Sequence, residues 1–242
     1  MTKDILMERY IRNIQIPQIG EEGQKKLLCA KVLIAGAGGL GSTVIALLAS
    51  AGVGKLGIID SDLIEITNLN RQFLHKTGDI GKEKSISAEK FVHELNPDIK
   101  VEAYQIRLNE QNYSEIIEKY EIIVDCFDNL ESKFLLNKIA LASKKPLIHG
   151  GVSEFGGQVT TVIPYETVCL SCLFGNIPET EKTKGVISPA VSTIASIQAM
   201  EVVKLITNTG CLLKNRILFY DGFGMTFKEL NTAKNPHCPL CK

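Results

Sequence analysis

The sequence predicts an α/β fold, a Rossmann-like and mostly parallel sheet with helices on both faces, extended by antiparallel strands in the C-terminal half. Short apolar runs alternate with helical patterns up to residue 150, which is the order of βαβ units in a parallel sheet. A glycine-rich turn follows the first apolar run and opens a helix, as in dinucleotide-binding folds. After Gly150 the helices become sparse and strand-like runs lie closer together.

The first half contains five expected strands and four expected helices. The strands are short apolar runs rich in β-branched residues, at residues 32–35, 56–60, 101–106, 122–125 and 146–149. The helices are expected at residues 40–51, 84–95, 113–120 and 131–143. The first of these helices is apolar on nearly every side, which is typical of a buried helix. The second ends at Asn96-Pro97, because the residue before a proline disfavours the helical region.

The second half contains three further expected strands, at residues 157–163, 216–220 and 225–230, and a helix of core type at residues 189–206. Residues 177–184 are polar and charged with no apolar period. We interpret this segment as a mobile loop that could close over a site, and a solvated connector is an equally weighted alternative.

Charge and composition narrow the class of protein. The 27 Lys and Arg residues balance the 27 Asp and Glu residues, whereas nucleic-acid binders usually carry a basic excess. Residues 1–10 are charged and lack an apolar signal core, so we expect a cytoplasmic protein. Residues 32–54 carry no charge but contain six glycines. A strand, turn and buried helix explain this stretch better than a membrane span does.

The glycine-rich turn predicts a nucleotide site. Its glycines allow a tight turn and a close approach of phosphate to the backbone, and the following helix supplies free N–H groups. An acidic residue is expected about 20 residues later, where it binds the ribose. Asp60 is in that place and Asp62 is beside it. A glycine-packed strand–helix turn is the alternative. The predicted phosphate-binding glycines are Gly36, Gly38, Gly39 and Gly41.

Two cations indicate a triphosphate rather than NAD. Arg71 lies in the segment Asn68-Leu-Asn-Arg-Gln72, and Lys84 follows Gly81 closely. Two positive charges beside a phosphate loop suit a displacement in which charge on phosphate must be neutralised.

Asp128 and Asn129 follow the fourth strand. Because ligands bind beyond the carboxyl ends of parallel strands, Asp128 is expected to hold Mg²⁺. The alternative is that Asp128 or Asn129 caps the next helix, and one residue of the pair can cap while the other binds.

Two CxxC pairs predict a metal site. Cys169 and Cys172 form one pair, and Cys238 and Cys241 form the other. Four thiolates fill the tetrahedral coordination of a structural zinc. Neither pair opens a helix after a strand, as a thioredoxin-like redox motif would.

Together these motifs resemble the MoeB/ThiF/HesA family, the bacterial relatives of ubiquitin-activating enzymes. The resemblance covers nearly the whole chain, and the motifs occur in the family's order. They are Arg9-Tyr-Ile-Arg12, the glycine loop, Ala51-Gly-Val-Gly54, Asp60, Asn68-Leu-Asn-Arg-Gln72, Lys84, Asn96-Pro97, Asp125-Cys-Phe-Asp-Asn129, Gly156-Gly-Gln158, Gln198-Ala-Met-Glu201 and the two cysteine pairs.

The resemblance implies an ATP-dependent adenylyltransferase with ATP, Mg²⁺ and structural zinc as cofactors. Its substrate is a small ubiquitin-like sulfur carrier of the MoaD or ThiS kind that ends in Gly-Gly. Arg71, Lys84 and Asp128 would act on the phosphates, with Asp60, Asp62, Asn68 and Asn129 contacting the nucleotide or its metal. Arg12 would reach the ATP of the other subunit of a homodimer. A sulfur donor such as a cysteine desulfurase or rhodanese would be a further partner.

The resemblance also implies a single adenylyltransferase domain over residues 1–242. Residues 1–150 form its ATP-binding half, and residues 151–242 form its carrier-docking and zinc-binding half. No membrane and no nucleic acid is expected as a partner. The remaining alternatives are an NAD-dependent oxidoreductase, a non-catalytic nucleotide-binding scaffold, and activation of a small acid or a tRNA group as in other branches of the superfamily.

Three positions depart from the family pattern. Many relatives carry a cysteine where Glu181 stands here, and the sequence has no cysteine between Cys172 and Cys211. Covalent persulfide or thioester handling of the carrier by this chain is therefore not expected. Phe127 replaces the usual threonine, and Asn13 replaces the usual glutamine.

Overall fold

The computed structural model describes residues 7–175 and 185–241. Eight strands form one sheet in the order β3-β2-β1-β4-β5-β6-β7-β8. Strands β1 to β5 pair in parallel, and β6, β7 and β8 continue the sheet with antiparallel pairing. The predicted fold class is confirmed. The strands are β1 (Lys31–Ala35), β2 (Lys55–Ile59), β3 (Lys100–Tyr104), β4 (Ile122–Asp125), β5 (Leu147–Ser153), β6 (Gly156–Val162), β7 (Arg216–Asp221) and β8 (Thr226–Asn231).

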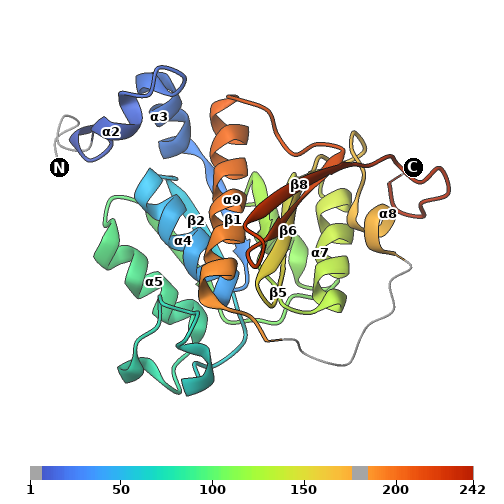
Figure 1. The fold of residues 1–242 in the computed structure, drawn as a ribbon. Helices are drawn as coiled ribbons and strands as arrows, with labels where there is room; N and C mark the ends of the chain where they lie inside the picture. Colours follow the sequence, from blue (N-terminus) through green and yellow to red (C-terminus); the bar gives the residue numbers. More distant parts are fainter. Residues whose placement is uncertain (1–6, 176–184, 242) are drawn as a thin grey trace.

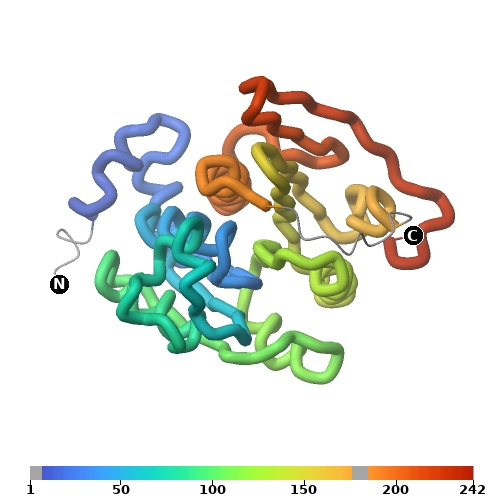
Figure 2. Tube along the Cα trace, turned by 60° about the horizontal axis from the view of Figure 1, so that its bottom comes forward, coloured from blue at the N-terminus to red at the C-terminus, as the bar shows by residue number. Residues whose placement is uncertain are grey.

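Helices cover both faces of the sheet. The described α-helices are α2 (Ile11–Ile14), α3 (Gly20–Cys29), α4 (Gly39–Ala51), α5 (Lys84–Leu95), α6 (Tyr113–Ile117), α7 (Leu130–Ala142), α8 (Leu170–Phe174) and α9 (Ser188–Thr207). One buried apolar cluster joins α3, α4, α5 and α9 to the even-numbered residues of β1, β2 and β4. A second cluster joins α6, α7 and α8 to their odd-numbered residues. The period of two along each strand separates these two cores. Helix α2 and the segment after β8 lie on opposite sides of the molecule (Figures 1 and 2).

Helix α9 is the one described helix that is long and apolar enough to cross a membrane, by length and composition alone. It packs against α4, β5 and β6, and half of its apolar window is buried within the molecule. This agrees with the core helix expected at residues 189–206.

Several element bounds differ from the expected ones. The helix expected at residues 113–120 ends at Ile117, and the strand expected at residues 146–149 continues to Ser153. Strand β5 therefore spans the expected boundary between the two halves. Three described helices were not expected: α2, α3 and α8. The loop expected at residues 177–184 lies outside the described residues.

Candidate nucleotide site and cysteine cluster

A cavity of about 1690 Å³ lies at the carboxyl ends of the parallel strands. It is larger than the roughly 300–1,000 Å³ typical of a pocket for one small molecule, so it has room for a nucleotide and a second ligand. It continues from the ends of β1, β2 and β4 across β5, β6 and β7. Nine of the predicted site residues line it, namely Gly36, Gly38, Gly39, Asp60, Asp62, Arg71, Lys84, Asp128 and Asn129.

The glycine loop connects β1 to α4, whose first turn faces the cavity. Gly36 has a φ of 106°, a conformation that favours glycine, and a Cβ there would lie 2.8 Å from the carbonyl oxygen of Cys126. Gly41 does not line the cavity. A Cβ at Gly41 would lie 2.0 Å from the carbonyl oxygen of Gly36, so its role is the close packing of the helix on the loop. The predicted phosphate contact of Gly41 is not supported by this geometry.

Asp60 follows β2 and holds the glycine loop. Its Oδ2 accepts a hydrogen bond of 2.7 Å from the backbone N–H of Ala37, and its Oδ1 accepts one of 2.9 Å from that of Asp62. Burial raises the pKa of Asp60, against the effect of these hydrogen bonds and of nearby Lys84. The carboxylate therefore lies beside the phosphate loop, in the position where ribose recognition is expected.

The two predicted cations, Arg71 and Lys84, also line the cavity. Lys84 is the first residue of α5, is buried, and has its Nζ 2.9 Å from Asp62 Oδ2. Arg71 donates to the carbonyl oxygen of Thr67 and to Asn70 Oδ1. Its aliphatic stem lies within 3.6 Å of where a Cβ of Gly39 would be. The stem of Arg71 is thus next to the first turn of α4, and Lys84 is paired with Asp62 at the cavity.

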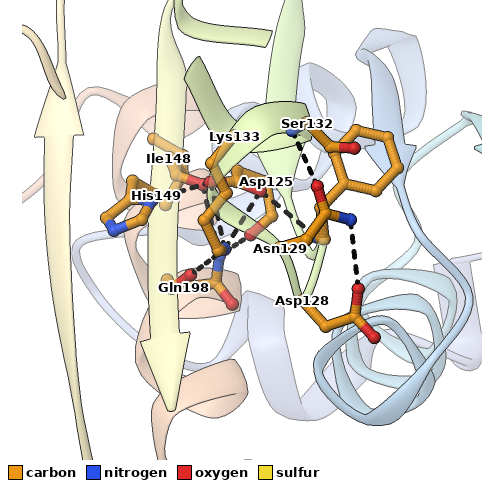
Figure 3. Close-up of polar contacts among 10 residues, drawn as sticks. Asp125, Asp128, Asn129, Ser132, Lys133, Ile148, His149 and Gln198 are labelled. Atoms are coloured by element: carbon orange, nitrogen blue, oxygen red, sulfur yellow. Dashed lines mark hydrogen bonds and ion pairs between the residues drawn. The ribbon is translucent and has the colours of Figure 1, made fainter. Parts of the chain in front are cut away.

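The pair Asp128 and Asn129 divides two tasks (Figure 3). Asn129 Oδ1 accepts a hydrogen bond of 2.8 Å from the backbone N–H of Ser132 and caps α7. Asn129 Nδ2 also donates to Asp128 Oδ1 at 3.3 Å. Asp128 is exposed and lines the cavity. Because the cap is supplied by Asn129, the carboxylate of Asp128 is available for a ligand.

Besides Gly41, two predicted site residues, Asn68 and Arg12, do not line the cavity. Asn68 Oδ1 accepts a hydrogen bond of 3.0 Å from the backbone N–H of Glu65 and so caps the 3₁₀-helix Ile66–Asn68. The predicted nucleotide contact of Asn68 finds no support in this arrangement. Arg12 lies on α2 and donates to Gln15 Oε1 at 3.3 Å. Its expected role requires a second subunit.

A buried polar network in the wall of the cavity was missed by sequence reasoning (Figure 3). Lys133 Nζ lies 3.3 Å from both carboxylate oxygens of Asp125 and donates to the carbonyl oxygen of Gly150 at 2.7 Å. Asp125 Oδ2 is 2.7 Å from His149 Nδ1. Burial acts to raise the pKa of Asp125, but Lys133 and His149 outweigh it and lower that pKa. A lysine in the first turn of a helix that follows an acidic strand end was the available signal.

The four cysteines of the two CxxC pairs form one cluster. Their sulfur atoms all lie within 4.8 Å of one another, with Sγ···Sγ distances of 3.7 Å from Cys169 to Cys238 and 3.4 Å from Cys172 to Cys241. Tetrahedral zinc with Zn–S bonds of about 2.3 Å separates its ligand sulfurs by about 3.8 Å. The cluster therefore fits a structural zinc. Glu181, the position where many relatives carry a further cysteine, lies outside the described residues.

A model of the ThiF family matches residues 10–240. The chain belongs to the ThiF family. The resemblance drawn from the motifs is thereby confirmed, and the glycine loop, Asp60, Arg71 and Lys84 all lie within the matched range.

Relatives of this ThiF-family chain extend over nearly its whole length. The SAMP-activating enzyme E1 of Haloferax volcanii is 40% identical over 240 residues, which cover 97% of this chain and 88% of that protein. The sulfur carrier protein adenylyltransferase of Thermus thermophilus is 37% identical over 247 residues, covering 97% of this chain and 90% of that protein. Escherichia coli MccB with MccA shares the fold with a TM-score of 0.85 and 26% identity, over 96% of this chain and 74% of that chain.

Proposed function

We propose that this ThiF-family protein is an ATP-dependent adenylyltransferase that activates the C-terminal glycine carboxylate of a small ubiquitin-like sulfur carrier. The products are the carrier acyl-adenylate and pyrophosphate. One observation carries the proposal: a single cavity brings the glycine loop, Asp60 and Lys84 together and then continues across β5 to β7. Its first part suits a nucleotide, and its second part suits a peptide tail. The relatives give no support to an oxidoreductase or to a non-catalytic scaffold.

The chemical step is a displacement at the α-phosphorus of ATP. An oxygen of the glycine carboxylate attacks that phosphorus, and the bond to the bridging oxygen of the β-phosphate breaks. The electron pair of this bond leaves with pyrophosphate. No base is required, because a terminal carboxylate is ionised at neutral pH. The barrier arises from an anion approaching a polyanion, so the ammonium group of Lys84 and the guanidinium group of Arg71 act by neutralising charge.

The proposed Mg²⁺ is held by Asp128. Its carboxylate faces the cavity and carries a single side-chain contact, from Asn129, among the described residues. Carboxylate plus phosphate oxygens are ligands that Mg²⁺ prefers. When bound, this ion supplies further charge neutralisation on the phosphates.

The remaining parts of the proposal concern assembly. The protein is a homodimer in which Arg12 of one subunit completes the cavity of the other. Residues 1–150 bind ATP and residues 151–242 dock the carrier and bind zinc, with both halves in one domain. A cysteine desulfurase or rhodanese supplies sulfur to the activated carrier. ATP dependence together with cysteines that act as thiols and zinc ligands favours a cytoplasmic location.

Exchange of labelled pyrophosphate into ATP tests the activity. We expect exchange in the presence of Mg²⁺ and a carrier that ends in Gly-Gly, and none with the same carrier shortened by two residues. Exchange at equal rates with both carriers contradicts the proposal. Mass spectrometry of the carrier after incubation with ATP then shows whether the adenylate forms.

A further inference from the structure

A buried ring nitrogen of His149, on β5, lies at the wall of the cavity without a hydrogen-bond partner among the described residues. His149 is 2% exposed and lines the cavity. Its Nε2 is buried and has no hydrogen-bond partner in the part of the chain that the structure describes. Buried polar atoms in native proteins are nearly always paired, because an unmade hydrogen bond costs free energy. An orphan at a cavity wall therefore points to a ligand atom that pairs with it.

The hydrogen-bond network determines what kind of partner Nε2 requires. The other ring nitrogen, Nδ1, lies 2.7 Å from Asp125 Oδ2. Lys133 lies 3.3 Å from the same carboxylate and favours its ionised form. An ionised carboxylate can only accept, so Nδ1 carries the proton of the neutral ring. Burial lowers the pKa of His149 and keeps the ring neutral. Nε2 is consequently an acceptor and requires a donor from the ligand.

His149 lies on a different strand from the residues that are expected to bind the nucleotide. Asp60 follows β2, the glycine loop follows β1 and Asp128 follows β4, whereas His149 lies one strand further on, in β5. The cavity continues beyond β5 to Phe155 and Tyr220. A chain that enters from β6 and β7 and ends at the α-phosphate must pass β5.

A second orphaned atom lies on the same face of β5. Ser153 Oγ is buried without a partner among the described residues, and Ser153 also lines the cavity. Residues 149, 151 and 153 point to one face because strand side chains alternate. Gly151, between these two residues, carries no side chain, and the amide of Gln158 on β6 lies 3.3 Å from where its Cβ would be. Gln158 also lines the cavity. This face therefore offers two unpaired polar atoms, with the side-chain amide of Gln158 between them.

The chemistry of a diglycine tail matches this face, if the proposed function holds. Two glycines present no side chains, so their polar groups are the backbone N–H and C=O groups and the terminal carboxylate. Only the N–H groups can donate to Nε2. We propose that the β5 face of His149, Gly151 and Ser153 binds the diglycine tail of the carrier, with His149 Nε2 accepting a hydrogen bond from a glycine N–H.

The variant His149→Asn separates this role from a structural one. The asparagine amide nitrogen can replace Nδ1 as donor to Asp125, but nothing replaces Nε2. In the exchange assay we expect the KM for the carrier to rise roughly tenfold, the worth of one hydrogen bond. The KM for ATP, kcat and the melting temperature are expected to stay near their wild-type values. His93→Asn, at an exposed histidine of α5, is the control and should change neither KM.

Carriers with one altered backbone atom test the donor directly. Semisynthesis can replace either terminal glycine by glycolate, so that one amide N–H becomes an ester oxygen. With the wild-type enzyme, one of the two ester carriers should show a KM raised roughly tenfold. With His149→Asn, that ester should carry no further penalty relative to the amide carrier.

Other outcomes overturn the assignment. An unchanged carrier KM in His149→Asn contradicts it, and so does an ester penalty of equal size in both enzymes. If His149→Asn does not fold, equal KM values for amide and ester carriers with the wild-type enzyme contradict it. Absence of carrier-dependent exchange in the wild type refutes the proposed function itself and this assignment with it.

Discussion

Lys84 and Asp62 form an ion pair of unequal exposure across the cavity wall. Their charged atoms are 2.9 Å apart, with the lysine side chain 8% exposed and the aspartate side chain 66% exposed. The ammonium group of Lys84 is thus held in place by the residues packed around it, whereas the carboxylate of Asp62 is exposed to solvent. An incoming phosphate can take over the ammonium group without moving it, which is the preorganisation that favours catalysis by charge.

Replacing Lys84 tests this role. Lys84→Met should lower the rate of pyrophosphate exchange by about 10²–10³-fold, the usual effect of removing one group that stabilises developing charge. Lys90→Met is the matched control, since Lys90 lies on the same helix with its side chain 67% exposed. A loss of similar size in both variants would show that the effect does not depend on the cavity.

Substitutions at Asp128 and Asn129 should have different effects, the first on activity and the second on stability. Asp128→Asn should strongly reduce Mg²⁺-dependent exchange with little change in the free energy of unfolding, because Asp128 does not cap α7. Asn129→Ala should lower the free energy of unfolding by about 1 kcal/mol through loss of the cap. Urea titrations and exchange rates measure the two effects. Unchanged exchange in Asp128→Asn would refute the metal assignment.

The cysteine cluster should bind one zinc per chain. Cys172→Ser should abolish that zinc, as measured by metal analysis, and lower the melting temperature. A loss of about 3 kcal/mol corresponds to roughly 6–12 °C for a chain of this size. Cys29→Ser, at an exposed cysteine outside the cluster, should leave zinc content and melting temperature unchanged. Full zinc content in Cys172→Ser would exclude that thiolate as a ligand.

The buried histidines predict a loss of stability on mild acidification. Burial lowers the pKa of both His75 and His149 below the usual value of 6.5. The unfolded chain then binds more protons than the folded chain, so stability is complete above pH 6.5 and declines as the pH falls towards the folded pKa values. Urea unfolding at pH 7.5 and 5.5 measures this decline. It should be smaller in His149→Asn, and an identical decline in that variant would contradict the assignment to His149.

A mixing experiment tests the shared site of the proposed homodimer. Arg12→Ala and Lys84→Met should each be inactive alone. In a mixed dimer, one cavity receives Lys84 from its own chain and Arg12 from the partner. An equal mixture with free subunit exchange should therefore recover about a quarter of wild-type activity. No recovery, with mixed dimers shown by native mass spectrometry, would contradict the role of Arg12.

Hydrophobic periodicity and helix-ending residues such as Asn96-Pro97 predicted the helices and strands well. The helix at residues 84–95 was predicted at its observed bounds, because Asn96-Pro97 ends it. Strand β5 was predicted too short, because Gly150 and Gly151 carry no strand signal of their own. Their pairing with Val159 and Gln158 of β6 keeps them in the sheet. Helix α8 begins directly after Cys169 and includes Cys172, and it has too few residues to show a period.

Motif order predicted which residues meet at the cavity, since glycine loops and acidic strand ends have fixed places in a parallel sheet. The sequence also predicted that one of Asp128 and Asn129 caps the helix, and Asn129 does so. It did not predict the local roles of Asn68 and Gly41. Asn68 caps a 3₁₀-helix, and Gly41 packs against Gly36. The Asp125–Lys133–His149 network joins β4, α7 and β5. The lysine after the acidic strand end signalled part of it, but no spacing along the chain placed His149 beside Asp125. Tertiary packing alone brings these groups together.

A zinc ion bound by the cysteine cluster would close a ring in the C-terminal part of the chain. Cys169 and Cys238 are 69 positions apart, and the chain between them includes α9 and the β7–β8 hairpin. A cross-link across a loop of this length removes roughly 4 kcal/mol of unfolded-state entropy in the simplest polymer estimate. Strand β8 forms one edge of the sheet. The ring would hold the segment that follows β8 against α7 and α8. With the metal in place, Cys238 and Cys241 would stay attached to α8, so the segment after β8 should not detach before the rest of the molecule unfolds.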